Sequence, residues 1–288
     1  MTQHQHGHRT QSQHEQGVAQ AHDHEADLAD MLDLDAEMLG SYLDEMTAWA
    51  ERHAREVPRR VVDLGAGTGT GTLALSRRFP QAEIVAIDSS ASMLERIGAS
   101  ARRHGLTERL RVVQADLDGV WPEIGAVDLA WAALSLHHVA DPDRMLSDLF
   151  AATNPGGLLV VIEMDSLPRF LPDDVGHGRS GLETRLHDAM AQDDWNAHPD
   201  WRASLERAGF AMAAQQTFDI AVSPAPPSIE RYARMFLGRV RSALEDRLTG
   251  DDLDTLDHLL ADESAHALLR QRDLTLRSSR TAWAARRP

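Results

Sequence analysis

Four glycines alternate with small residues in the stretch VVDLGAGTGTG, residues 61–71, directly after a short apolar run. A glycine-rich turn between a strand and a helix lets the backbone approach a nucleotide closely. The dinucleotide fingerprint needs glycine at its sixth position, which is Thr70 when counted from Gly65. Asp63 would lie close to an anionic pyrophosphate at a cost, whereas it would attract a cation. The loop therefore favours a positively charged nucleotide ligand.

Groups that could accept a proton follow two later apolar runs. His137 and His138 come after AALSL, and Glu163 ends the run GGLLVVIE. An imidazole titrates near neutral pH, so a histidine here could serve as a general base. The alternative is that the histidine pair only caps a strand end. Asp165 is a comparable candidate to Glu163, with a solvated loop carboxylate as its alternative, and His177 is a weaker candidate.

These groups need elements that bring them to one edge. Residues 60–163 alternate helical segments with the β-rich runs RRVVDLG, AEIVAID, RLRVVQAD, AVDLAWAAL and GGLLVVIE. Asp141 can cap a helix that has Pro142 at its first position, and that helix is expected to end in the turn NPGG. Strands alternating with helices predict a parallel α/β sheet, because parallel neighbours need a crossover. Ligands of such sheets bind at the carboxyl ends of the strands.

The ordered motifs of this region resemble those of class I S-adenosylmethionine (SAM)-dependent methyltransferases. The first motif of that family is an acidic residue followed by G-x-G-x-G, here Asp63, Gly65, Gly67 and Gly69. VDLAWAALSLHHV resembles the fourth-strand motif, and NPGGLLVVIE resembles the turn and strand after it. The resemblance covers about residues 60–165. It implies a Rossmann-like α/β fold with a mostly parallel seven-stranded sheet, helices on both faces, and helical N-terminal and C-terminal additions.

The resemblance also implies a set of SAM-binding residues. Asp88, at the end of AEIVAID, would accept hydrogen bonds from both ribose hydroxyls. Asp116 would meet the adenine amino group, with Leu117 packing nearby. Both carboxylates could instead be ordinary residues at strand ends, and Trp131 could either line the pocket or belong to the core. The implied cofactor-binding set is Asp63, Gly65, Ala66, Gly67, Gly69, Asp88, Ser89, Asp116, Leu117 and Ala132.

Composition excludes several kinds of chemistry. The 288 residues contain no cysteine and no lysine, which excludes disulfides, thiolate nucleophiles and Schiff bases from this chain. The formal net charge of −16 disfavours nucleic acids and anionic membranes as partners. No run approaches the about 18 apolar residues of a membrane helix, and the N-terminus is polar and rich in histidine. A soluble, cytoplasmic protein is expected.

The chain before the core divides into two parts. Residues 1–24 are predicted to be a disordered, His-rich tail, with a metal-binding or pH-sensing tail as the alternative. Residues 25–57 show helical spacing of apolar side chains and predict two helices, broken near DLD at residues 33–35. These helices either cover a sheet edge, which the sequence favours, or close over a ligand. The SAM-binding core is expected at residues 58–165.

Residues 166–288 are predicted to complete the sheet. MDSLPRFLPDDVGHGRS predicts a long lid loop, DWRASLERAGF a helix, and AAQQTFDIAVS and TLRSSRTAWAARRP two strands. A helical insertion is expected over about residues 228–272. Four aromatic residues of this region suggest either an apolar acceptor pocket or further core: Trp195, Trp201, Tyr232 and Phe236.

The function that these features favour is transfer of a methyl group from SAM to an oxygen or nitrogen atom of a small molecule. Two alternatives are a peptide or protein methyltransferase and a non-enzymatic protein that binds SAM or handles metals. A nicotinamide oxidoreductase is disfavoured by Asp63 and by the missing third glycine. No metal site is expected in the folded part, and a homodimer is possible.

Overall fold

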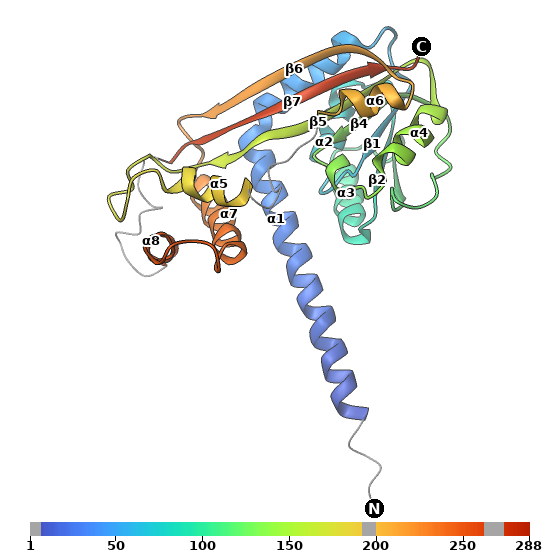
Figure 1. Ribbon diagram of the computed structural model, residues 1–288. Helices are drawn as coiled ribbons and strands as arrows, with labels where there is room; N and C mark the ends of the chain where they lie inside the picture. Colours follow the sequence, from blue (N-terminus) through green and yellow to red (C-terminus); the bar gives the residue numbers. More distant parts are fainter. Residues whose placement is uncertain (1–6, 192–199, 262–273) are drawn as a thin grey trace, which may run out of the picture.

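The computed structural model describes residues 7–191, 200–261 and 274–288, which form one α/β sheet structure (Figure 1). The strands are β1 Arg60–Leu64, β2 Glu83–Asp88, β3 Leu110–Gln114, β4 Val127–Ala133, β5 Thr153–Arg169, β6 Ala211–Val222 and β7 Leu276–Arg286. The helices are α1 Gly7–His53, α2 Thr70–Arg78, α3 Ala91–Arg103, α4 Pro142–Ala152, α5 Leu182–Ala191, α6 Arg202–Arg207, α7 Ile229–Ala243 and α8 Gly250–Leu260, with a short 3-10 helix, η1, at Leu136–His138.

The sheet has seven strands in the order β3-β2-β1-β4-β5-β7-β6. β3, β2, β1, β4 and β5 are parallel to one another, and β7 is antiparallel to both β5 and β6. The chain moves outward from β1 to β3 and then restarts with β4 on the other side of β1. A crevice opens where the strand order reverses in this way, so the carboxyl ends of β1 and β4 are where a ligand is expected. This confirms the predicted mostly parallel, Rossmann-like sheet.

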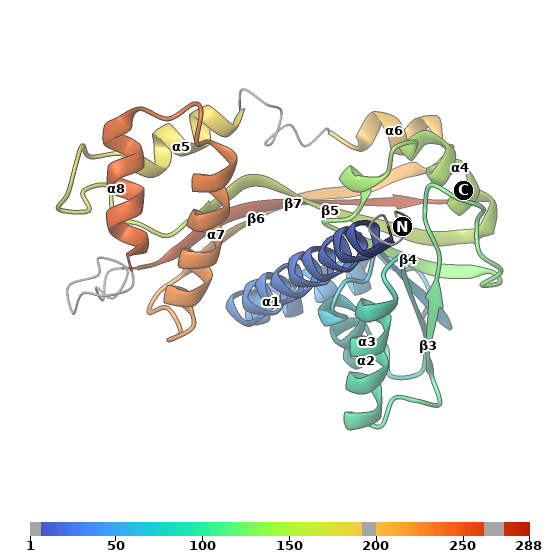
Figure 2. The same cartoon turned by 90° about the horizontal axis from the view of Figure 1, so that it is seen from below.

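The last three strands are longer than the parallel core. β5 has 17 residues, and its pairing with β7 continues from Leu158 opposite Arg286 to Arg169 opposite Arg277. The extension projects beyond the parallel strands, and α5, α7 and α8 gather around its far end (Figures 1 and 2). β5 therefore occupies the start of the segment for which the sequence predicted a lid loop. Pairing with β7, which is more than 100 residues away in the chain, satisfies its backbone there.

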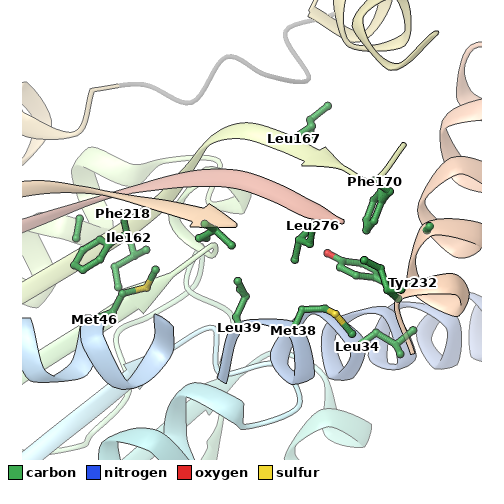
Figure 3. Packing of buried hydrophobic residues seen from close by; sticks show 14 of the residues in the cluster. Leu34, Met38, Leu39, Met46, Ile162, Leu167, Phe170, Phe218, Tyr232 and Leu276 are labelled. Carbon is green, nitrogen blue, oxygen red and sulfur yellow. The ribbon is translucent and has the colours of Figure 1, made fainter. Parts of the chain in front are cut away.

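Two layers of helices cover the sheet. β1 contributes Val61 to one buried cluster and Val62 to the other, because successive side chains of a strand point to opposite faces. The first cluster joins the sheet to α1, α2, α7 and α8, and the second joins it to α4 and α6. Figure 3 shows the first cluster from close by, with α1 side chains directed at the long strands and at Tyr232 of α7.

α1 corrects two expectations for the N-terminal region. It is one continuous helix of 47 residues, without the break predicted at residues 33–35, and its backbone is helical from Gly7, where a disordered tail was predicted through residue 24. No proline interrupts it, and extending an existing helix costs little. Leu34 is buried and Asp35 has tertiary partners, so packing holds the acidic segment in the helix. None of the described helices has the length and apolar composition needed to cross a membrane.

Local signals at α4 were partly confirmed. The Asp141 carboxylate accepts a hydrogen bond from the backbone N–H of Arg144, and Pro142 is the first helical residue, as predicted. The turn predicted at NPGG lies instead at the start of β5, where the register against β4 shifts between Val127 and Leu129. α6, β6, α7, α8 and β7 occupy the segments predicted for them, while residues 192–199 and 262–273, including Trp195, lie outside the described part.

Candidate functional site

The glycine loop lies at the carboxyl end of β1, pressed against the end of β4. Gly65, Gly67 and Gly69 all have positive φ angles, of 67°, 53° and 89°. A Cβ atom on Gly65 would lie only 2.5 Å from the Cβ of Ser135, a distance that side chains do not tolerate. Glycine is therefore required here by both backbone conformation and space. The turn leaves the backbone of the loop as part of the wall of a cavity.

Asp88, at the end of β2, holds this loop in place. Its two carboxylate oxygens accept hydrogen bonds from the backbone N–H groups of Gly67, at 2.8 Å, and Ser90, at 2.9 Å. Asp116 follows β3, is exposed, and accepts from the backbone N–H of Asp118 at 2.9 Å. Both carboxylates line the cavity, so the strand ends present two acceptors for hydroxyl or amino groups.

Asp63 lies one layer below the cavity wall. Its side chain accepts a hydrogen bond of 2.6 Å from the Thr72 hydroxyl and is almost fully buried. Burial raises the pKa of Asp63 to about 7, and the neighbouring Asp88 adds to the rise, while the bond from Thr72 opposes it. A Cβ on Gly71 would lie 3.2 Å from Asp63 Oδ2 and 3.3 Å from Trp131 Nε1, so glycine leaves room for both groups at this point. A cation bound nearby would favour the ionised carboxylate.

The cavity has a volume of about 530 Å³, within the usual range for small-molecule sites. Two different walls enclose it. The strand-end wall consists of the glycine loop with Asp88, Ser89, Asp116 and Leu117. The helix wall consists of α1 side chains and one residue of β7: Leu28, Leu32, Asp35, Leu39, Leu43, Met46 and Arg280. α1 thus closes over the cavity, so the favoured interpretation of it as a mere cover for a sheet edge was incomplete.

The strand-end wall fits SAM. Carboxylates of Asp88 and Asp116 can accept from ribose hydroxyls and an amino group, and a bound cation would favour the ionised form of the buried Asp63. Two further observations point to a ligand. The Nε1–H of Trp131 is buried without a partner among the described residues, and so is the Ser135 hydroxyl. Both residues line the cavity. Among the residues that the structure describes, no cluster of three or more His, Cys, Asp or Glu could hold a metal ion.

The candidate bases separate into two groups. His138 lines the cavity, at the end of η1 beyond β4. His137 does not line it, and its Nδ1 lies 2.8 Å from Glu163 Oε2. Glu163 is completely buried and does not line the cavity either, so it has no direct access to a ligand there. The two imidazole rings are 4.0 Å apart. Through its contact with His137, Glu163 can act on the cavity by way of the histidine pair.

Other predicted residues lie elsewhere. Asp165 accepts a hydrogen bond from the Thr281 hydroxyl, and His177 stacks on His258 of α8, 4.3 Å between ring centroids. Ala132 belongs to the core on the opposite face, and its neighbour Ala133 lines the cavity in its place, because adjacent strand residues face opposite sides. Three of the aromatic residues are packing residues: Trp201, Tyr232 and Phe236.

The sequence did not single out the polar group of the helix wall. Arg280 Nη2 donates to Asp35 Oδ2 at 2.7 Å, and the Tyr232 hydroxyl donates to Asp35 Oδ1 at 2.8 Å. Burial and the Asp35 carboxylate raise the pKa of Tyr232 well above its ordinary value, so it stays a donor. A signal did exist, because Asp35 interrupts the apolar α1 face formed by Leu28, Leu32 and Leu39. Its partners are 197 and 245 residues away in the chain.

Comparisons with known proteins match the part of the chain that contains the strand-end wall. Residues 61–157 match the model of a family described as a methyltransferase domain. Residues 61–157 thus carry a class I SAM-dependent methyltransferase domain, and SAM is the cofactor of such domains. The fold is that of methyltransferases: a candidate methyltransferase from Bacillus halodurans C-125 superimposes with a TM-score of 0.53 at 17% identity, over 84% of this chain and 98% of the other.

Two curated relatives have more specific names. A trans-aconitate 2-methyltransferase of Variovorax paradoxus is 39% identical over 138 residues, which are 46% of this chain and 50% of that protein. A demethylmenaquinone methyltransferase of Thermus thermophilus is 34% identical over 114 residues, 40% of this chain and 51% of that protein. The chain thus spans about half the length of the curated relatives it matches.

Proposed function

We propose that this protein transfers a methyl group from SAM to an oxygen or nitrogen atom of a small-molecule acceptor. The observation that carries the proposal is a cavity with two different walls, one of carboxylates and glycine backbone, the other largely apolar. The strand-end wall would hold SAM, which supplies the methyl group. The helix wall would hold the acceptor. An acceptor enclosed between α1 and the strand ends is more easily a small molecule than a protein surface.

His138 is the proposed general base. It is the one histidine among the described cavity-lining residues, and it lies at the end of η1, beyond β4 and beside the proposed cofactor site. A bound SAM would supply the methyl group and would keep the electron pair of the broken bond on its sulfur. His138 would take the proton that the acceptor atom loses as it bonds to the methyl carbon. The His137–Glu163 pair would act as a positioning group, because its 2.8 Å contact anchors η1 to β5.

The first test is calorimetric titration of SAM and S-adenosylhomocysteine into the wild-type protein and into Asp88→Ala. A hydrogen bond to a charged group contributes about 1.5–3 kcal/mol, so losing the bonds between Asp88 and the ribose should lower the affinity about tenfold or more. Asp143→Ala is the matched control, because Asp143 forms an exposed ion pair with Arg207. The proposal is supported if the wild-type protein and Asp143→Ala bind both ligands and Asp88→Ala does not. Wild-type protein that binds neither ligand contradicts it.

The base is tested by turnover once an acceptor is in hand. We expect His138→Asn to lower kcat by about 100-fold or more while KM for SAM stays within a few-fold. Glu163→Gln should lower kcat less and should alter the pH profile, because it acts through His137. Equal loss of SAM affinity and kcat in His138→Asn would argue for a binding residue instead of a base.

A further inference from the structure

The polar group in the helix wall is a preformed, charge-balanced pair. Arg280 and Asp35 are joined at 2.7 Å, and their side chains are only 10% and 19% exposed. The Tyr232 hydroxyl fixes the second oxygen of Asp35. The Nε–H of Arg280 is buried without a partner among the described residues. A buried donor in this state favours a ligand atom that accepts a hydrogen bond.

The surroundings of this pair are apolar on one side and acidic on the other. Leu28, Leu32, Leu39, Leu43 and Met46 line the helix wall next to it. Across the cavity, the strand-end side carries three carboxylates: Asp88, Asp116 and Asp118. Arg280 is the one arginine among the described cavity-lining residues, and the chain has no lysine. Asp35 already balances its charge, so little net positive charge remains for an acidic ligand.

We propose that the acceptor is an uncharged, largely apolar molecule with at least one hydrogen-bond-accepting oxygen, and that the Asp35–Arg280 pair selects it over carboxylic acids. Arg280 donates to the acceptor oxygen, while Asp35 repels a carboxylate at the same position. This inference rests on the proposed function and narrows it. It separates this chain from relatives named for trans-aconitate, because that ligand carries three carboxylates and would meet one balanced arginine.

The test compares two probes with the same apolar body. Octanamide and octanoate are titrated into protein saturated with S-adenosylhomocysteine, and trans-aconitate is titrated separately. We expect wild-type protein to bind octanamide at least about tenfold more tightly than octanoate. The amide oxygen can accept a hydrogen bond from Arg280, whereas Asp35 repels the carboxylate of octanoate. Trans-aconitate should show no binding. Equal or tighter binding of octanoate, or binding of trans-aconitate, would overturn the inference.

Two substitutions should reduce this preference by different routes, one through octanoate and the other through octanamide. Asp35→Asn releases the charge of Arg280 and should improve octanoate binding about tenfold, whereas Arg280→Gln should weaken octanamide binding about tenfold. The matched control is the exposed pair of α4 and α6, with Asp143→Asn and Arg207→Gln expected to change nothing. An unchanged preference in both Asp35→Asn and Arg280→Gln would mean that the pair only joins α1 to β7, and the inference would be wrong.

The affinity for S-adenosylhomocysteine separates the possible failures. If the wild-type protein does not bind it, the proposed function fails. If the wild-type protein binds S-adenosylhomocysteine but prefers octanoate or binds trans-aconitate, only the inference about the acceptor fails. Should Asp35→Asn lose its fold, Tyr232→Phe deletes one hydroxyl that holds Asp35 and should reduce the preference for octanamide severalfold. A preference that remains at the wild-type value in Tyr232→Phe would count against the inference.

Discussion

The two walls of the cavity are built in different ways. The strand-end wall uses backbone groups and carboxylates at the ends of consecutive strands, with contacts such as Gly67 to Asp88 that span 21 residues. The helix wall joins α1 to α7 and β7 through Asp35, whose partners are 197 and 245 residues away. The first wall is a property of the parallel sheet itself. The second depends on β5, β6 and β7, which extend beyond the parallel strands and support α1 and α7 (Figures 1 and 3).

This difference explains why one wall carries recognisable motifs and the other does not. Positive φ angles and close backbone approach restrict the strand-end wall to glycine at particular positions. Apolar residues of the helix wall can exchange with one another at small cost as long as volume is kept. The strand-end wall is therefore more restricted in sequence than the helix wall.

The largest effect that would separate the two walls is expected at Gly65. Gly65→Ala places a Cβ 2.5 Å from Ser135 Cβ at a φ of 67°. Overpacking and the left-handed backbone together should lower the free energy of unfolding by about 2–4 kcal/mol. SAM affinity should fall as well. Urea unfolding would measure the free energy of unfolding, and calorimetry would measure the affinity.

Gly238→Ala in α7 is the matched control for that substitution. Nothing lies within 4 Å of a Cβ at Gly238. Because glycine is unfavourable inside a helix, the free energy of unfolding of this variant should rise by about 0.5–1 kcal/mol. If both variants behaved alike, backbone geometry would not distinguish the strand-end wall from the rest of the molecule.

The pH dependence of SAM binding gives the second-largest effect. With a pKa of about 7, Asp63 in the ligand-free protein is protonated in mild acid, and a cation must displace that proton. SAM affinity should therefore fall up to about tenfold per pH unit below 7 in calorimetric titrations. Asp63→Asn should bind SAM weakly at pH 8 and lose most of this pH dependence. A wild-type profile that is flat from pH 5.5 to 8 would rule out this role for Asp63.

Asp63 also affects the stability of the ligand-free protein, with a defined sign. Its pKa is raised from an ordinary value of 3.8 to about 7 by the fold, so the folded state binds a proton more tightly than the unfolded state does. The contribution of this group to the free energy of unfolding is thus greatest in acid and falls as pH rises from about 4 to 7. Asp63→Asn should abolish that decline, which urea unfolding at several pH values would measure.

The smallest effect is expected from the helix wall acting on the cofactor. A Cβ on Gly67 would lie 3.3 Å from Leu32 Cδ1, so this leucine covers the glycine loop. Leu32→Ala should lower SAM affinity by about threefold to tenfold, because partly buried apolar surface is lost. Val57→Ala is the control, since Val57 is 75% exposed. No change in Leu32→Ala would show that the two walls act independently of each other.

Local sequence was sufficient to predict the strand-end wall. Asp63, the glycines and the carboxylates at residues 88 and 116 follow strands that alternate regularly with helices, so their spacing predicted the sheet and its ligand-binding edge. The resemblance of these motifs to those of a methyltransferase family predicted the cofactor. The cap of α4 was predicted in the same way, because an Asp-Pro pair acts within one turn.

The helix wall and the roles of the histidines became visible only once the chain was folded. The continuity of α1 depends on partners of Asp35 in α7 and β7, and no local pattern encodes a contact across 245 residues. The positions of Ala132, Glu163 and His138 depend on which face of a strand or turn each side chain occupies, and a one-residue difference reverses that face. Which residues meet across α1, and which histidine reaches the cavity, both follow from packing between distant segments of the chain.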